Sequence, residues 1–336
     1  MISARGVARA AAFLILGVLC WPCYAGQPYT VTGLPGTPCG INDLGQVVGY
    51  TQAQDPAAYL WLPDAAYGLP AGTNLLGSPP GFPRSFAWAI NNHGQIVGHV
   101  ADRQSASTCG FLWQEGSMST VDWGTCMAIN DAGDVVGCGR GDHPFLWRGS
   151  LSYLGELTGG HTGVARGINE SGQIVGYSGA SDGASHAVLW QNGTVTDIGS
   201  PGEAYAINES GQVVGWGGQT AFLWPNGSLG SLPSYTRSVA YAINDTAVVV
   251  GEAYDNNERV WHAFISEGGV MQDLNDLVDR TSYGGTLRSA MGINNIGQIL
   301  VLGANGEGLL LTPIPEPATL LLLALGGAAL VRRRRT

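Results

Sequence analysis

The stretch "INESGQIVGY" at residues 168–177 decides the fold, because nearly the same ten residues occur seven times along the chain. The copies begin at Ile41, Ile90, Ile129, Ile168, Ile207, Ile243 and Ile293. Successive copies lie 36 to 50 residues apart, and three of the intervals are 39 residues. A period near 40 residues without a helical pattern predicts a propeller blade of four strands.

Turn chemistry explains why the phrase repeats. Asn-x-x-Gly closes a tight hairpin, since the Asn side chain bonds to its own backbone and the Gly adopts positive φ. The Ile before it and the Val-Val or Ile-Val after it are β-branched and favour packing between sheets. A single hairpin cannot bury its apolar face alone, so the copies are expected to stack. We therefore interpret the phrase as scaffold.

The remainder of each period supplies the other strands. In the fifth copy we predict strands over residues 204–208, 212–216, 220–224 and 228–232. An aromatic residue recurs in the third strand, at Trp61, Trp113, Trp147, Trp190 and Trp224. Because the five tryptophans occupy one equivalent position of the repeat, we predict that they form a circle of stacked side chains packed between the blades. A stripe of aromatic side chains that binds a ligand is the alternative.

The two ends of the repeat region predict how the ring closes. The seventh copy stops after its third strand, and "YTVTGL" at residues 29–34 resembles the fourth-strand sequence "GTVTDIG" at residues 193–199. An N-terminal strand that completes the last blade would remove the open sheet edge. We therefore predict an all-β, seven-bladed propeller of four-stranded antiparallel blades over residues 26–312, with an open solenoid as the alternative.

The N-terminus predicts a cleavable signal helix over residues 1–25. Arg5 and Arg9 precede an apolar run at 10–19, and small residues in "CYA" favour cleavage after Ala25. A lipoprotein at Cys20 or Cys23 is an alternative that lacks the expected small neighbours. A membrane anchor is another, but the run is short for a span.

The C-terminus, residues 313–336, has three parts in a fixed order. Pro315, Glu316 and Pro317 precede an apolar run at 318–331, and Arg332, Arg333, Arg334 and Arg335 follow it. As a helix the run measures about 21 Å, short of the ~30 Å hydrocarbon core, with the arginines on the cytoplasmic side. An ordinary short tail anchor is the alternative interpretation, which the short length of the run disfavours.

This tripartite tail resembles the PEP-CTERM sorting signal of Gram-negative bacteria that make exopolysaccharide. The resemblance implies transient association with the inner membrane, processing by an exosortase near Pro-Glu-Pro, and a final location at the cell surface or outside the cell. It also suggests exopolysaccharide, or another surface component, as a partner.

The net charge of the domain excludes polyanionic partners. Removing both ends takes away six arginines and one glutamate, which leaves nine arginines against 24 acidic residues and a net charge near −15. The chain contains no lysine. We therefore expect neither nucleic acid nor anionic lipid as a ligand of the domain.

Four cysteines remain after residue 25, at Cys39, Cys109, Cys126 and Cys138. An even number in an oxidising compartment permits disulfides in three connectivities. We favour a Cys126–Cys138 disulfide, because the two residues flank one predicted hairpin at nearly opposite positions. Buried thiols are the alternative.

The third strands, such as "HAVLW" (186–190) and "HAFIS" (262–266), together with the Ile-Asn phrase, resemble the bacterial extracellular HAF repeat. The resemblance covers roughly residues 29–312. Only His186 and His262 match the histidine of that family closely. The resemblance implies architecture and an extracellular location, and no particular reaction.

Antiparallel order places the connections on two faces of the ring. The turns between strands one and two and between strands three and four share what we call the turn face; the other connections share the loop face. The long predicted loop-face insertions cover residues 70–84, 101–108, 252–260 and 278–288. Function concentrates on loops held by a rigid scaffold, so the loop face is the candidate site, with neutral loop variation as the alternative.

Five loop-face side chains are candidates for ligand binding: Arg84, Arg237, Arg288, Tyr254 and Tyr283. The three arginines precede an Ile-Asn pair by five or six residues, which predicts entry near the central channel. Guanidinium groups there would grip a carboxylate or an acidic sugar, and the tyrosine rings would stack on sugar faces. Solvated loop residues are the alternative.

Catalytic motifs are missing from the sequence. The six histidines are scattered without metal-ligand spacing, and no nucleophile elbow, phosphate loop or dinucleotide fingerprint occurs. We therefore predict no enzyme activity, no cofactor and no metal site. The expected function is a non-catalytic surface or matrix protein associated with exopolysaccharide. The alternatives are a glycan-active lyase or hydrolase and a protein-docking scaffold.

Overall fold

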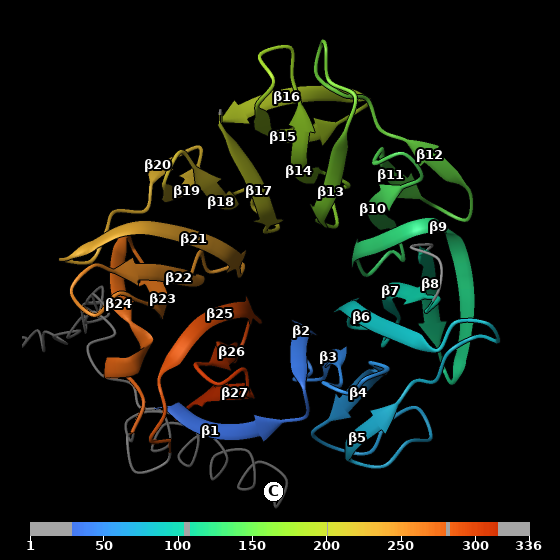
Figure 1. Cartoon of the computed structure of the whole chain (residues 1–336), viewed down its shortest axis with the longest axis horizontal. Coiled ribbons are helices and arrows are strands. Elements are labelled where there is room, and N and C mark those ends of the chain that lie inside the picture. Colours follow the sequence, from blue (N-terminus) through green and yellow to red (C-terminus); the bar gives the residue numbers. More distant parts are fainter. Residues whose placement is uncertain (1–28, 104–107, 200, 280–282, 315–336) are drawn as a thin grey trace, which may run out of the picture.

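The computed structural model describes residues 29–103, 108–199, 201–279 and 283–314. These residues form seven antiparallel blades around a central axis, which confirms the predicted fold (Figure 1). The predicted signal segment at residues 1–25 and the Pro315–Arg335 sorting residues lie outside the described residues. Within the described part of the chain, no helix has the length and apolar character needed to cross a bilayer.

Each blade is described from its innermost strand outward, in the colours of Figure 1. The first blade contains β2 (Thr37–Ile41), β3 (Val47–Tyr50), β4 (Ala58–Leu62) and β5 (Gly72–Leu75). The second contains β6 (Arg84–Ile90), β7 (Ile96–Ala101), β8 (Thr108–Gln114) and the first part of β9 (Ser117–Ile129). The third contains the second part of β9, β10 (Val135–Gly139), β11 (Pro144–Trp147) and β12 (Leu151–Tyr153).

The remaining blades follow the same plan. The fourth contains β13 (Gly163–Ile168), β14 (Ile174–Gly179), β15 (Ser185–Gln191) and β16 (Thr194–Gly199). The fifth contains β17 (Gly202–Ile207), β18 (Val213–Gly217), β19 (Thr220–Trp224) and β20 (Gly227–Ser228). The sixth contains β21 (Tyr235–Ile243), β22 (Val249–Asp255), β23 (Val260–Glu267) and β24 (Val270–Asp273), followed by the short helix η1 (Leu274–Asp276). The seventh contains β25 (Leu287–Ile293), β26 (Ile299–Gly303), β27 (Gly308–Pro313) and β1 (Tyr29–Leu34).

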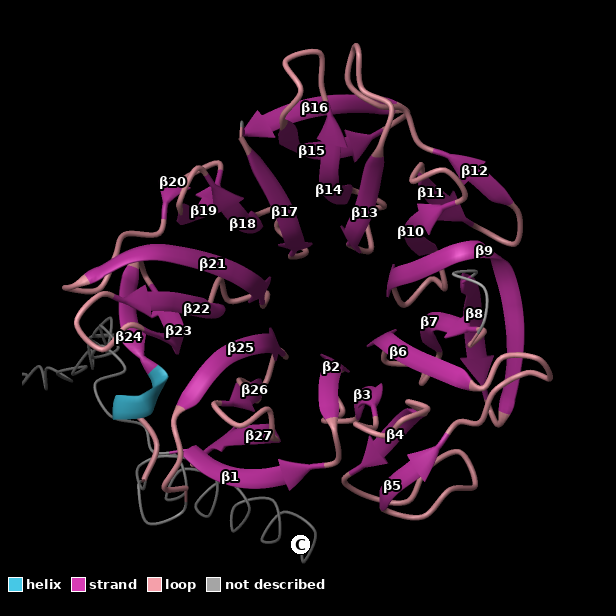
Figure 2. Ribbon diagram, in the orientation of Figure 1, coloured by secondary structure: helices cyan, strands magenta, loops and turns pink. Residues whose placement is uncertain are grey.

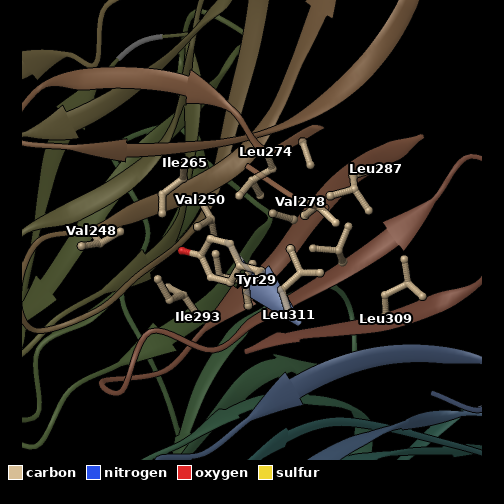
Figure 3. Packing of buried hydrophobic residues seen from close by; sticks show 14 residues of the cluster. Tyr29, Val248, Val250, Ile265, Leu274, Val278, Leu287, Ile293, Leu309 and Leu311 are labelled. Carbon is tan, nitrogen blue, oxygen red and sulfur yellow. The ribbon is translucent and has the colours of Figure 1, made fainter. Parts of the chain in front are cut away.

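The N-terminal strand closes the ring, as predicted. β1 pairs antiparallel with β27 over its whole length, from Tyr29 opposite Pro313 to Leu34 opposite Gly308. The Tyr29 side chain is 3% exposed and lies in a hydrophobic cluster between the sixth and seventh blades (Figure 3). Closure therefore combines a backbone ladder with a buried aromatic residue.

Two neighbouring blades share one strand, which the sequence did not predict. β9 is 13 residues long and joins the second and third blades into one seven-stranded sheet. Its partner changes from β8 at Trp123 to β10 at Gly124. Gly124 has φ near +127°, and a Cβ there would lie 2.1 Å from the Cys138 carbonyl oxygen. Glycine is required at this bend because a side chain would collide with the next strand.

The repeated Val-Val pair explains how the blades stack. Val48 packs toward the second blade beside Ala87 and Phe111, whereas Val47 packs toward Leu300 of the seventh blade. Successive residues of a strand point to opposite faces, so each pair fills two interfaces. The five recurring tryptophans also lie in hydrophobic clusters between blades: Trp61, Trp113, Trp147, Trp190 and Trp224.

The Asn of the repeated phrase has a second role that turn chemistry alone does not reveal. Within its own turn, Asn169 accepts a hydrogen bond from the Gln173 amide, at 2.9 Å. Its side-chain amide also donates to the Asn208 carbonyl of the next blade, at 3.1 Å. The same interblade bond joins all seven blades in a closed ring, through Asn42, Asn91, Asn130, Asn169, Asn208, Asn244 and Asn294.

One predicted loop-face insertion is divided between the two faces. Residues 72–75 of the 70–84 stretch form β5, the fourth strand of the first blade. The connection 63–71 therefore lies on the turn face, and only 76–83 lies on the loop face. The strand was missed because "GTNL" lacks the β-branched pattern of the other strands.

Candidate functional site

The central axis opens on the turn face through a ring of polar side chains. Each blade contributes the residue after its Asn, which gives Asp43, Asn92, Asp131, Glu170, Glu209, Asp245 and Asn295. They border a cavity of about 300 Å³. Each of these residues uses its backbone N–H to donate to the side chain of the next, for example Asn92 to Asp131 at 2.7 Å. Among the described residues, no group of three or more His, Cys, Asp or Glu side chains is placed to hold a metal ion.

A β-bulge in every innermost strand shapes the channel wall below this ring. In β13, for example, Ala165 pairs with Gly176 and Gly167 with Val175, so Arg166 is the extra residue. A bulge leaves one residue unpaired and re-aims its side chain. The seven bulged residues are Cys39, Trp88, Met127, Arg166, Tyr205, Tyr241 and Met291. Because the innermost strands surround the axis (Figure 2), the seven bulges lie around the channel, and we call these residues and the side chains that they contact its wall.

The fourth, fifth and sixth blades supply what we call the charged half of the wall. Arg166 Nη2 lies 2.9 Å from Glu203 Oε2, which also accepts a hydrogen bond from the Tyr205 hydroxyl at 3.3 Å. The Arg166 guanidinium lies over the rings of Tyr205 and Tyr177, 4.8 and 5.5 Å from their centroids. Arg166 Nε is buried and has no hydrogen-bond partner within the described residues.

The charged half continues into the sixth blade. The rings of Tyr205 and Tyr241 meet edge to face at 5.4 Å, and the Tyr241 hydroxyl donates to Glu252 Oε1 at 3.0 Å. Burial, followed by the Glu252 carboxylate, raises the pKa of Tyr241, while Arg288 acts in the opposite direction. Burial and Glu203 likewise raise the pKa of Tyr205. Both phenols therefore remain protonated hydrogen-bond donors at neutral pH.

The first and second blades supply the aromatic half of the wall. Tyr50 contacts Phe86 and Trp88 edge to face, with ring centroids 4.9 and 6.0 Å apart. His99 stacks on Phe86 at 4.7 Å and accepts a hydrogen bond from Trp88 Nε1 through its Nδ1, at 2.9 Å. Burial and the Arg84 charge lower the pKa of His99 to about 4. The imidazole is therefore neutral, with its proton on Nε2.

The two halves lie across the channel from each other. In Figure 1, β2 and β6 lie on the side of the axis away from β17 and β21. Sequence reasoning missed this wall, although a signal was present. In every copy the bulged residue stands two positions before the Ile, and in six of the seven copies it lies between two smaller residues, as in Ala87-Trp88-Ala89 and Ala204-Tyr205-Ala206.

Of the five predicted ligand-binding residues, the structure brings Arg237 and Tyr254 into contact, and the other three make their contacts elsewhere. Arg84 donates to the Asp102 carbonyl in the second blade. Arg237 stacks on Tyr254 of the sixth blade, 4.6 Å from the ring centroid. Tyr283 donates to Glu307 in the seventh blade, and Arg288 is exposed on β25.

β6, β21 and β25 run inward toward the axis, so the arginines near their starts lie farther out than the bulged residues (Figure 1). Two members of the set have an electrostatic link to the wall, Arg288 through Tyr241 and Arg84 through His99. A ligand-binding role for the five residues stays a prediction.

The predicted Cys126–Cys138 disulfide is wrong. All four cysteines of the described chain are thiols. Cys138 pairs across the strands with Thr125, and Cys126 pairs with Gly137. Directly paired residues share a face and successive residues alternate, so the two thiols point to opposite faces of the sheet.

A histidine stands at or just before the start of the third strand in three blades. The sequence analysis singled out His186 and His262, and the structure adds His143. Each Nδ1 pairs with an acidic residue of the fourth strand or just beyond it: His143 with Glu156 at 2.7 Å, His186 with Asp197 at 2.6 Å, and His262 with Asp273 at 2.6 Å. The pairing therefore ties the third strand to the outer edge of the blade.

Comparison with known proteins identifies the tail. Residues 313–335 match the family model described as the PEP-CTERM protein-sorting motif, and the match includes Pro315, Glu316, Pro317 and the arginines 332–335. The motif implies recognition by an exosortase and export to the surface or the extracellular space. A search of the curated proteins gives no match.

Several solved structures resemble this chain at low sequence identity. A structure titled "YCF48 bound to D1 peptide" has a TM-score of 0.48 and 11% identity, over 86% of this chain and 97% of that one. A virginiamycin B lyase from Staphylococcus aureus has a TM-score of 0.48 and 10% identity, over 85% and 100%. The WD40 propeller of Doa1 has a TM-score of 0.43 and 13% identity, over 86% and 96%.

Proposed function

We propose that this exported protein binds a carbohydrate, without cleaving it, in the channel between the aromatic and charged halves of the wall. The observation that carries the proposal is the juxtaposition of these two surfaces across one axis. Aromatic rings pack against the apolar face of a pyranose, and charged and hydroxyl groups hydrogen-bond to its edge. The Arg166 side chain, 28% exposed, offers guanidinium donors for a ligand oxygen.

The protonation states favour binding over catalysis. Hydrolysis of a glycoside needs one carboxylic acid that donates a proton and a second carboxylate that acts as base or nucleophile. Glu203 is instead paired with Arg166, and Glu252 accepts from Tyr241. The raised pKa values of Tyr205 and Tyr241 disfavour a phenolate base. Trp88 Nε1 donates a hydrogen bond to His99 Nδ1, the nitrogen that would otherwise accept a proton.

The source of the ligand is part of the same proposal. The PEP-CTERM resemblance suggests a Gram-negative host that makes exopolysaccharide, and we propose that polymer as the ligand. We also propose that the blades are repeats of the HAF type. The histidines at residues 143, 186 and 262 support this, because each stands at or just before the start of a third strand, as in the HAF-like sequences "HAVLW" and "HAFIS", and pairs with an acidic residue.

The test is equilibrium binding of the purified mature chain to exopolysaccharide from the producing cells, with polymer length measured in the same samples. We expect saturable binding, intact polymer, and a loss of at least tenfold in affinity for Trp88→Ala and Tyr205→Ala. Tyr153→Ala is the matched control, because Tyr153 is 51% exposed at the end of β12, away from the wall.

Variants of the predicted loop-face arginines separate the two candidate surfaces. Weakening by Arg237→Ala but not by Tyr205→Ala would move the site outward to the stack of Arg237 on Tyr254. Shortened polymer would favour the lyase or hydrolase alternative. If the polymer is neither bound nor cleaved, the carbohydrate proposal is contradicted and the protein-docking scaffold remains.

A further inference from the structure

Both ends of the propeller leave it at one place on the turn face. Tyr29, the first residue of β1, pairs with Pro313, the last residue of β27. Pro313 contacts the turn of its own blade, since its Cγ lies 3.6 Å from the Cβ position of Gly297. Thr312 also accepts a hydrogen bond from Gln298 at 3.2 Å. The segments before residue 29 and after residue 314 therefore both start beside the 294–297 turn.

Exposed apolar side chains occur on the turn face of the blade that contains this exit and of its two neighbours. Seven large hydrophobic residues are exposed in the described part of the chain, and four of them lie on the turn face of the consecutive sixth, seventh and first blades. They are Val270 at 55%, Ile296 at 59%, Ile314 at 39% and Leu44 at 56%. The other blades carry His93, Ala132, Ser171, Ser210 and Thr246 where Leu44 and Ile296 stand. We call these four residues the exit patch.

The chain that follows the patch is apolar and its connection is short. Only Pro315, Glu316 and Pro317 separate Ile314 from the apolar run at 318–331. Four extended residue steps span at most about 14 Å, less than the roughly 20 Å of a six-residue strand such as β27. If it forms a helix, the apolar run would span about 21 Å, short of the ~30 Å hydrocarbon core, which would draw the domain toward the surface.

We propose that in the unprocessed protein the exit patch rests on the membrane surface, with the loop face turned away from it. The tether is too short for the loop face to reach the membrane while residues 318–331 are inserted. The partner is a zwitterionic lipid surface, because the turn-face turns carry several acidic residues and, in the described chain, a single arginine, Arg148. An anionic surface would be repelled by the carboxylate ring.

The test uses the full chain with Cys20→Ser and Cys23→Ser, reconstituted in phosphatidylcholine vesicles. An environment-sensitive dye is attached at Ile296→Cys, or at Val260→Cys as the matched control. Val260 is also an exposed β-branched residue, 40% exposed, but it starts β23 on the loop face. The Cys20→Ser, Cys23→Ser chain without a reporter cysteine measures how much dye attaches to the native thiols. Leu44→Cys is a second reporter if Ile296→Cys folds poorly.

We expect iodide quenching at position 296 to fall several-fold on reconstitution, and quenching by nitroxide lipid to appear there and not at 260. With a spacer of twelve Gly and Ser residues after Ile314, iodide quenching at position 296 should rise close to that at position 260. If the dye at position 296 stays protected despite the spacer, the patch itself contacts the membrane. Equal quenching at both positions without the spacer would overturn the proposal. Protection at 296 that appears only after an exosortase is added would also overturn it, in favour of an enzyme-docking surface.

Discussion

The side-chain amide of Asn169 donates to the backbone carbonyl of Asn208, 3.1 Å away in the next blade. The equivalent bond at each interface makes the repeated Asn both a turn residue and a link between blades. Its side chain is buried, so its hydrogen-bond partners lose their bonds without compensation by water when it is removed. The blades are thereby coupled at the axis, where their strands come closest.

We expect Asn169→Ala to lower the free energy of unfolding by about 2–3 kcal/mol, because it removes bonds within its turn and to the next blade. Urea denaturation measures the change. Asn226→Ala is the control, since Asn226 is exposed in an outer turn, and should change stability by less than about 0.5 kcal/mol. Equal effects would show that the interblade bond adds nothing.

Removal of the Tyr29 ring should cost about 3–5 kcal/mol, the usual loss for a buried aromatic residue replaced by Ala. The ring fills the interface between the sixth and seventh blades, so Tyr29→Ala should also open the closure. Thermal unfolding and protease sensitivity of β1 are the measurements. Thr32→Ala, on the exposed side of the same strand, should leave both unchanged.

The His186 pairs should make stability depend on pH. Hydrogen bonds to Asp197 and then Asp182 raise the pKa of His186 above its usual 6.5. A raised folded-state pKa means that the contribution is fully present below about pH 6.5 and is lost as pH rises through the folded value. The midpoint temperature of thermal unfolding of the wild type, relative to that of His186→Gln, should therefore decrease as the pH is raised from 6 to 9. A constant difference across this range would contradict the pairing.

Arg166→Lys should weaken ligand binding more than it changes stability. Lysine keeps the charge beside Glu203 but cannot present the planar fork that both pairs with the carboxylate and stacks on Tyr205. Binding affinity, relative to Arg148→Lys at the exposed Asp134 pair, is the measurement. If the two substitutions weaken binding equally, the channel wall is not the ligand site.

Reducing agent should not alter the stability of the mature chain. The four cysteines are thiols, and burial raises the pKa of Cys39 to about 12, so it resists oxidation. Alkylation after denaturation, without prior reduction, should add four labels by mass spectrometry. Two labels, together with a lower unfolding temperature in reductant, would show that a disulfide forms.

Much of the architecture follows from the sequence alone. The period, the Asn-x-x-Gly turns and the leading "YTVTGL" strand determine seven blades and their closure, because turn chemistry and strand alternation act over a few residues. The tail at 313–336 is equally readable, since its signal is a short contiguous order of Pro-Glu-Pro, apolar run and arginines.

The channel wall, the thiol directions and the exit patch were decided only by tertiary structure. Arg166, Tyr205 and Tyr241 stand 36 to 39 residues apart and differ in type, so their shared place two positions before an Ile does not by itself show that they meet. Each occupies a bulge, and bulges become neighbours only when the innermost strands are brought around one axis. A one-residue offset likewise turned Cys126 and Cys138 apart, because side chains alternate between the faces of a strand.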